Sequence, residues 1–309
     1  MGSRRGLIRS GNSAAIRNVL ADGLERLFKW KWEPEMTDRL KDFSRLCIHT
    51  MTTKPWNLRE CIDGYSSAGV PAITVWRHHI EPLGSKEAGR MLAESGLRVV
   101  SLCRGGFFPA ASAAGREKAR DENRKIIDEA AAIGAPLIVL VCGAVPGIPL
   151  PEARQQILDG IAAVLPHARA AGVKLSIEPL HPMYADDRSA VNTLEQANNM
   201  VLALRSPWVG VTVDVYHCWW DPMLKSEIQR AGENLLSFHV CDWRTPTRDL
   251  LNDRGMMGEG CVDLQSIRGM VEATGFNGFI EVEIFSNQFW AWEQASLVER
   301  IKQSYLTSV

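Results

Sequence analysis

The sequence lacks the features that mark secreted or membrane-spanning proteins. Its seven cysteines are an odd number and contain no C-x-x-C pair, a pattern typical of reduced thiols rather than of a disulfide framework. No stretch approaches the run of about 18 apolar residues that a spanning helix needs, and no apolar segment follows the arginines near the N-terminus. We therefore expect a cytoplasmic protein that has no membrane partner.

The sequence also lacks an excess of either charge. It contains 35 lysines and arginines against 36 aspartates and glutamates, so the formal net charge is −1. A protein that binds a nucleic-acid backbone usually presents a basic face, and this balance argues against such a partner. The dinucleotide-binding fingerprint G-x-G-x-x-G after an early strand is absent as well, because the nearest match, GMMGEG at 255–260, comes late in the chain. We expect no nucleotide cofactor.

Short apolar runs alternate with longer helical patterns from about residue 43 to the C-terminus. The expected strands span 45–51, 72–77, 98–104, 136–142, 174–180, 210–217, 235–242 and 279–285. The expected helices span 57–68, 85–95, 116–133, 151–171, 193–205, 222–231, 264–274 and 292–307. Strands that are apolar on both faces and separated by helices are typical of a parallel sheet. Eight strand–helix pairs predict an α/β fold of the (β/α)8 TIM-barrel type.

No linker rich in proline or glycine divides residues 43–309, so this part of the chain is predicted to be one catalytic domain. Residues 1–42 are predicted to form a short N-terminal extension. Within it, residues 13–29 place apolar side chains on one face of an amphipathic helix. We expect this helix to pack against the barrel or a neighbouring subunit, and we expect a homo-oligomer.

Polar side chains occur at the carboxyl ends of the last four strands, where TIM barrels carry their active sites. They are Glu178, Asp214, His239 and Glu283. A single such residue would usually be a cap or a hydrogen-bonded core residue, but four at matching depth on consecutive strands favour a shared cation. Three carboxylates and one imidazole suit Mn²⁺, with Mg²⁺, Co²⁺ and Zn²⁺ as alternatives. Glu281, two residues before Glu283, should lie deeper in the barrel and accept a hydrogen bond from one of the metal-binding side chains.

Several motifs resemble one known family in order and spacing. IEPLHP, VDVYH, FHVCDW, RGMMGEGCVDL and EVEIF are similar to segments of the sugar phosphate isomerase/epimerase superfamily of xylose isomerase-like TIM barrels, over about residues 43–307. That superfamily includes ketose 3-epimerases, hydroxypyruvate isomerase and inosose dehydratase. The resemblance implies a small sugar or related polyol as substrate, and a divalent ion bound by the four residues named above.

The resemblance also implies catalytic roles. Glu178 and Glu283 would move a proton next to a substrate carbonyl through an enediolate intermediate. His217 would hydrogen-bond a substrate oxygen, and Arg244 or Arg248 would supply the basic contact that follows strand seven in the family.

One position departs from the ketose 3-epimerase pattern. His181 stands where those enzymes usually have asparagine, three residues after the glutamate. It is either a further catalytic base or a turn-capping residue before Pro182. His79 and Trp220 are further candidates for substrate contacts, and other candidates near the barrel mouth are His78, Arg104, Trp219 and Trp243.

The departure at His181 leaves a second activity open. The larger subunit of C-glycoside deglycosidases also resembles this superfamily. Such an enzyme would begin with the same proton removal on a 3-oxo-glycoside but expel the aglycone, and it would need a small second subunit. A barrel that has lost its chemistry and a DNA-cleaving enzyme are disfavoured, because the four-residue ligand set is intact and a basic face is missing.

Overall fold

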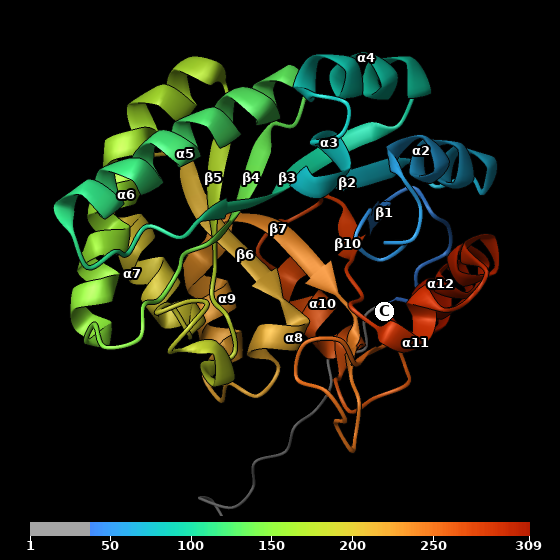
Figure 1. Ribbon diagram of the computed structural model, residues 1–309. Coiled ribbons are helices and arrows are strands. Elements are labelled where there is room, and N and C mark those ends of the chain that lie inside the picture. Colours follow the sequence, from blue (N-terminus) through green and yellow to red (C-terminus); the bar gives the residue numbers. More distant parts are fainter. Residues whose placement is uncertain (1–37) are drawn as a thin grey trace, which may run out of the picture. The chain divides into compact units, whose positions relative to one another are not determined.

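The computed structural model describes residues 38–309, and its centre is a closed barrel of eight parallel strands (Figure 1). Around the barrel the strands follow the order β1, β10, β7, β6, β5, β4, β3, β2. They are β1 (Leu46–His49), β2 (Ala72–Trp76), β3 (Arg98–Gly106), β4 (Leu137–Val141), β5 (Lys174–Glu178), β6 (Val209–Asp214), β7 (Leu235–Val240) and β10 (Ile280–Val282). The predicted TIM barrel is confirmed.

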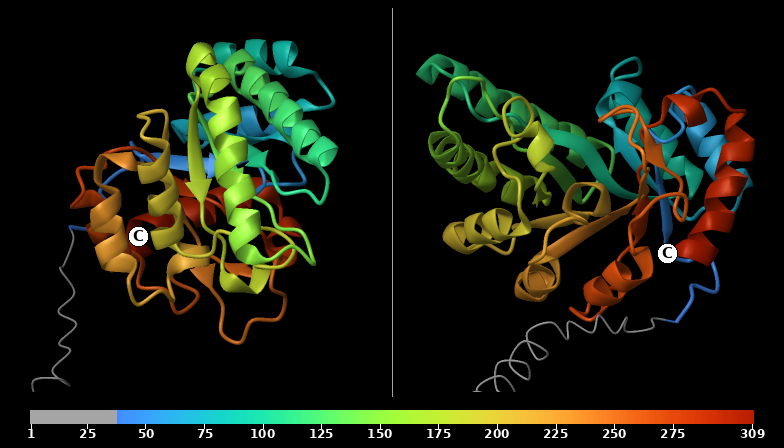
Figure 2. Two further views of the ribbon diagram at one scale, coloured as in Figure 1. Left: turned by 90° about the vertical axis from the view of Figure 1, so that its left-hand side faces the viewer. Right: turned by 90° about the horizontal axis from the view of Figure 1, so that it is seen from below.

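Helices surround the barrel, with α12 beside α2, where the ring of helices closes (Figures 1 and 2). The longer helices are α2 (Leu58–Ser67), α4 (Ser85–Ser95), α5 (Ala113–Ala132), α6 (Leu150–Ala171), α7 (Leu194–Leu204), α9 (Leu224–Ala231), α10 (Leu264–Glu272) and α12 (Gln294–Ser308). Each corresponds to a helix predicted from the sequence. Among residues 38–309 none is both long and apolar enough to cross a membrane.

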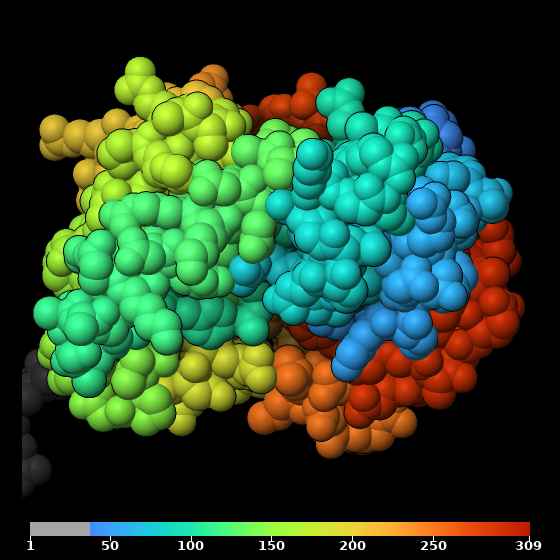
Figure 3. All heavy atoms as spheres, turned by 45° about the horizontal axis from the view of Figure 1, so that its top comes forward, coloured from blue at the N-terminus to red at the C-terminus, as the bar shows by residue number. Residues whose placement is uncertain are grey.

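Short helices that were not predicted follow several strands and, in the case of η2, helix α9. They are α3 (Arg77–Ile80), α8 (Val215–Cys218), α11 (Asn287–Trp290), η1 (Pro182–Tyr184) and η2 (Gly232–Asn234). The amphipathic helix predicted over 13–29 lies outside the described residues, and the boundary placed after residue 42 stays a prediction. Figure 3 shows one face of the molecule, across which α6, α5, α4 and α2 follow one another in this order.

The strands are buried on both faces, as the apolar runs predict. Every residue of β1, β4 and β6 is buried, because helices cover the outside and side chains fill the inside. The register aligns the strand ends on one level: Asp214 pairs with His239, and His239 in turn pairs with Glu281. Parallel pairing therefore brings residues that are far apart in the sequence to one end of the barrel.

A two-stranded ribbon follows β7 where the sequence predicted only a loop. Strands β8 (Asp242–Trp243) and β9 (Arg254–Gly255) pair in antiparallel fashion. The Asp242 carboxylate accepts hydrogen bonds from the main-chain N–H groups of Gly258 (2.9 Å) and Val262 (3.0 Å). The GMMGEG segment thus forms a turn held by one buried carboxylate, and the ribbon fixes Arg254 at the barrel mouth.

Candidate metal and active site

The four predicted metal ligands converge at the carboxyl ends of β5, β6, β7 and β10. Glu178, Asp214, His239 and Glu283 each offer one ligand atom, and these atoms all lie within 4.8 Å of one another. All four side chains are buried. Carboxylates brought this close out of water need a compensating positive charge.

The His239 ring is oriented so that one nitrogen faces the carboxylates. Its Nδ1 lies 3.2 Å from Glu178 Oε1 and 3.9 Å from Glu283 Oε2, while its Nε2 lies 2.9 Å from Ser237 Oγ. Neither His239 Nδ1 nor Glu178 Oε1 has a hydrogen-bond partner among residues 38–309, although both atoms are buried. Two unsatisfied electron-pair donors in a group of carboxylates fit a divalent cation.

Glu281 lies beneath this set, as the strand parity predicts. Its carboxylate accepts hydrogen bonds from Thr74 Oγ1 at 2.5 Å, from Ser101 Oγ at 3.3 Å and from Ser237 Oγ. Burial alone would raise the pKa of Glu281, but the imidazoles of His239 and His49 lower it to about 2. Glu281 is therefore an ionised anchor for the residues above it.

The prediction from sequence missed His49, at the end of β1. Its Nδ1 lies 3.1 Å from Glu283 Oε1 and its Nε2 lies 3.3 Å from Glu281 Oε2. Burial would lower the pKa of this imidazole, but the two carboxylates raise it to about 9. A single histidine in an apolar run gave no signal, because such residues are usually part of the core.

The prediction from sequence also missed Arg254. Its Nη1 lies 2.7 Å from Glu283 Oε2 and 3.1 Å from Asp214 Oδ2, and its guanidinium lies between the rings of Tyr216 (4.4 Å) and Phe285 (4.6 Å). Burial would raise the pKa of Glu283, but Arg254 and His49 hold it well below its usual range. For Asp214, burial prevails over Arg254 and raises the pKa to about 7.

Arg244 and Arg248, the residues predicted to supply the basic contact, lie elsewhere. Arg244 Nη2 pairs with Glu259 at 3.2 Å, and Arg248 is exposed and pairs with Asp253. Neither lines the cavity beside the predicted metal ligands. The physical reason is that the β8–β9 ribbon turns the chain back, so the later arginine of the loop, Arg254, reaches the mouth.

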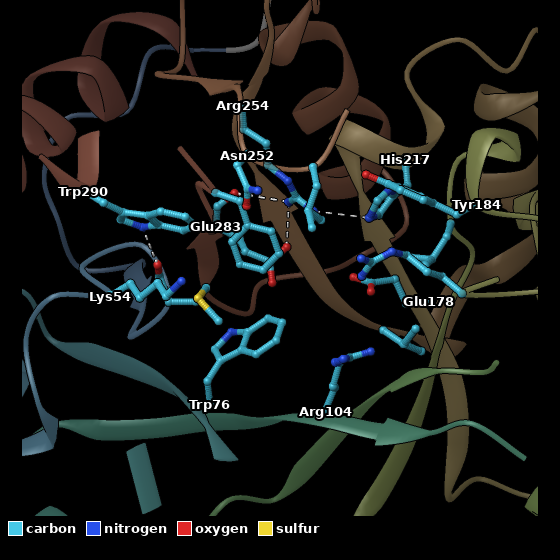
Figure 4. Close-up of a pocket in the computed structure, with 16 residues that line it drawn as sticks. Lys54, Trp76, Arg104, Glu178, Tyr184, His217, Asn252, Arg254, Glu283 and Trp290 are labelled. Carbon is cyan, nitrogen blue, oxygen red and sulfur yellow. Dashed lines mark hydrogen bonds and ion pairs between the residues drawn. The ribbon is translucent and has the colours of Figure 1, made fainter. Parts of the chain in front are cut away.

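A cavity of about 220 Å³ opens beside two of the four ligands, Glu178 and Glu283 (Figure 4). Its walls combine acidic, basic and aromatic side chains. They include Glu178 and Glu283, the cationic residues Lys54, Arg104, Arg188 and Arg254, and the aromatic residues Trp76, Tyr184, Phe285 and Trp290. The volume and the mixture of flat rings and charges suit a small polar molecule.

The structure brings only some of the predicted substrate contacts to this cavity. His217 and Arg104 line it, whereas His181, Trp220 and His79 do not. The Trp219 and Trp243 rings also lie outside it, and Trp76 and Trp290 supply its indoles instead. His79 Nε2 lies 3.0 Å from the Trp56 carbonyl oxygen, so His79 belongs to the packing behind β2.

His181 has the geometry of the turn-capping alternative. Its Nδ1 accepts a hydrogen bond from the Met183 main-chain N–H at 3.2 Å, and its ring stacks on Trp243 with centroids 5.1 Å apart. The ring of Trp220 meets its edge at 5.6 Å. The tryptophans expected at the mouth therefore surround His181 rather than the cavity.

The comparison with known proteins confirms the family. Residues 62–303 match the family described as xylose isomerase-like TIM barrel. The chain belongs to this family. The crystal structure of protein SMc04130 from Sinorhizobium meliloti 1021 superposes with a TM-score of 0.83 and 49% sequence identity, covering 85% of this chain and 98% of that chain.

More distant relatives include named enzymes. An inosose isomerase of Bacillus subtilis is 24% identical over 157 residues, which are 50% of this chain and 55% of that protein. The chain thus spans about half the length of the curated relatives that it matches first. The structure of the IOLI protein with a bound zinc atom has a TM-score of 0.73 and 20% identity, covers 84% of this chain and 96% of that chain, and shares its fold. The curated relatives that the chain matches first are therefore inosose isomerases.

Proposed function

We propose that the protein is a divalent-metal-dependent isomerase or epimerase of a small sugar or related polyol. The observation that carries the proposal is the convergence of Glu178, Asp214, His239 and Glu283 within 4.8 Å, with two buried donor atoms unsatisfied. Mn²⁺ suits three carboxylates and one imidazole, and Zn²⁺ is the alternative. Such an ion, when bound, polarises a substrate carbonyl and stabilises negative charge on its oxygen.

The two glutamates have different surroundings, and this difference assigns their roles. Glu283 contacts Arg254 and His49, which keep it in the ionised form that can accept a proton from the carbon next to the carbonyl. Glu178 has no arginine or lysine within 4.0 Å among residues 38–309, and its Oε1 lies 3.2 Å from His239 Nδ1. We infer that Glu283 removes the proton, and that Glu178 donates one to the resulting enediolate. The reverse reaction exchanges these roles.

His217 is placed to orient the substrate. Burial, reinforced by Arg254, lowers the pKa of His217 well below its usual range, so the ring is neutral. The main-chain N–H of His181 donates to His217 Nδ1 at 3.3 Å. The other ring nitrogen, Nε2, lies 3.3 Å from Arg254 Nη2, a group that can only donate, and 3.7 Å from Asp214 Oδ2. These contacts hold the ring at the cavity wall, where it can contact a substrate oxygen. In this arrangement His181 acts through its main chain, as a positioning residue.

Hydrogen exchange in D₂O tests the proposal. The Mn²⁺-loaded protein is incubated with inososes, ketohexoses and 3-oxo-glucosides, and deuterium at the carbon next to the carbonyl is followed by NMR. We expect exchange with at least one compound, and its loss of about 100-fold or more in Glu178→Gln, as is typical of general acid–base residues. Glu94→Gln, on the exposed face of α4, is the matched control. Absence of exchange across the whole panel would contradict the proposal.

Elimination is a second candidate because a further cavity adjoins the first. This cavity of about 420 Å³ shares Met51, Trp76 and Arg104 with the site, so a substrate could extend into it with a bulky substituent. Removal of the same proton from a 3-oxo-glycoside would then expel an aglycone, as in a C-glycoside deglycosidase with its small second subunit. Release of the aglycone, measured in the same panel, distinguishes this outcome from isomerisation.

A further inference from the structure

Two arginines of the cavity form no ion pair within residues 38–309. Arg104, on β3, and Arg188, after η1, both line the cavity, yet neither forms an ion pair with a carboxylate anywhere in residues 38–309. Both guanidinium groups lie over aromatic rings: Arg104 is 4.4 Å from the Phe107 ring centroid and Arg188 is 5.4 Å from that of Tyr184. Buried or half-buried arginines usually have an anionic partner.

The carboxylates nearest to the cavity belong to the set of metal ligands. Glu283 and Asp214 pair with Arg254, and Glu178, whose Oε1 has no hydrogen-bond partner among residues 38–309, is part of the proposed metal site. Arg104 enters the cavity from the β3 side, whereas Arg254 lies at its opposite end (Figure 4). The two unpaired arginines are therefore additional to the charges that balance the metal ligands.

The end of β3 is built to hold Arg104 in this place. Gly106 has φ of +109°, and a Cβ there would lie 2.0 Å from the Val141 carbonyl oxygen, so only glycine fits. Asn123 fixes the same residue from α5, because its Oδ1 accepts from Gly106 N at 2.8 Å and its Nδ2 donates to Gly106 O at 2.7 Å. These contacts fix the main chain at the end of β3, from which the Arg104 side chain enters the cavity.

The two arginines also oppose each other electrostatically. Burial lowers the pKa of Arg104, and the positive charge of Arg188 lowers it further, while the carboxylates of Glu178 and Glu283, which form no ion pair with it, raise it by less. Two like charges that share one cavity are unfavourable unless an anion lies between them. Lys54 adds a third positive charge at the rim, where its Nζ lies 4.5 Å from the Trp290 ring centroid.

We propose that Arg104 and Arg188 form a subsite for an anionic substituent of the substrate, either a carboxylate or a phosphate monoester on the sugar. The inference rests on the proposed function and narrows its substrate class. A guanidinium offers two parallel N–H donors that match the oxygens of both groups. The substrate would place its anionic end between these arginines and its carbonyl end over the metal ligands, with Trp76 beside the carbon skeleton.

Calorimetric binding of three matched probes tests the subsite without turnover. The probes are glucose 6-phosphate, glucuronate and glucose, each titrated into the Mn²⁺-loaded protein. We expect at least one of the two anionic probes to bind about tenfold or more tightly than glucose, because a charge-assisted hydrogen bond is worth about 1.5–3 kcal/mol. A preference for the phosphate or for the carboxylate identifies which of the two groups the subsite takes.

Arg104→Met and Arg188→Met should each abolish that preference, so that the anionic probe binds no more tightly than glucose. Arg124→Met, which removes a solvent-facing arginine of α5, is the matched control and should keep the preference. Thermal melting verifies that each variant folds. If Arg104→Met does not fold, Arg188→Met alone still tests the subsite. Equal affinity for all three probes, or a preference that survives both variants, would overturn the proposal. If the original protein prefers an anionic probe in this way but catalyses no hydrogen exchange in D₂O, the subsite stands and only the proposed function is contradicted.

Discussion

Replacing Arg254 with methionine tests the electrostatics of the site most fully. The guanidinium pairs with Asp214 and Glu283 at 3.1 and 2.7 Å, and all three side chains are buried. Removing one partner of a buried ion pair leaves uncompensated charge and costs about 3–5 kcal/mol of unfolding free energy. We expect this loss for Arg254→Met in the metal-free protein, because no other arginine or lysine within residues 38–309 reaches both carboxylates.

A bound divalent ion should reduce the cost. It neutralises Asp214 and Glu283 directly, so the variant then loses only hydrogen bonds to charged groups, about 1.5–3 kcal/mol. Urea unfolding, followed by circular dichroism with EDTA and again with excess Mn²⁺, measures both values. The ion should therefore stabilise the variant more than the original protein.

Arg90→Met is the matched control for this experiment. Arg90 also pairs with two carboxylates, Glu87 and Glu94, but all three side chains are exposed, and exposed ion pairs contribute about 0–1 kcal/mol. Its loss should be small and equal in both conditions. An equal loss of unfolding free energy in Arg254→Met with EDTA and with Mn²⁺ would show that no ion neutralises Asp214 and Glu283, contrary to the prediction.

Three further predictions concern single residues around the site. His181→Asn should change kcat by less than about threefold, since asparagine can also cap the turn. A loss of about 100-fold in steady-state turnover would instead indicate that His181 is a catalytic base. Glu281→Gln should weaken Mn²⁺ binding by about 10–100-fold in a metal titration, because Glu281 anchors His49 and His239, and unchanged affinity would contradict this role. Burial, aided by His78, lowers the pKa of His79 to about 4, so the unfolded chain binds a proton at a pH where the folded protein does not. The free energy of unfolding should therefore fall between about pH 6.5 and pH 4, and in His79→Gln this fall, measured by urea unfolding, should be smaller by about 2–3 kcal/mol.

The part of the site that the sequence predicts is the part encoded within single strands. Glu178, Asp214, His239 and Glu283 each end an apolar run, and parallel pairing brings consecutive strand ends together. The positions of the strands along the sequence and their order in a closed barrel are therefore enough to place these four residues together. The same reasoning puts Glu281 one layer deeper, where it lies.

The residues that the sequence missed depend on tertiary structure. His49 meets Glu283 only because the first and last strands pair when the barrel closes. Arg254 reaches the mouth because an unpredicted ribbon reverses the chain, and its separation from β7 along the sequence gave no hint of this. The choice between base and cap for His181 depended on a side-chain orientation, which no spacing encodes.

Metal content tests the central claim most directly. The purified chain is loaded with Mn²⁺, desalted, and analysed beside Glu283→Gln and the surface control Glu94→Gln by inductively coupled plasma mass spectrometry. The four-residue ligand set predicts about one ion per chain in the original protein and in the control, and a large loss in Glu283→Gln, because charged carboxylate ligands dominate the affinity for such an ion. Negligible metal in all three proteins, or equal metal in all three, would contradict the account.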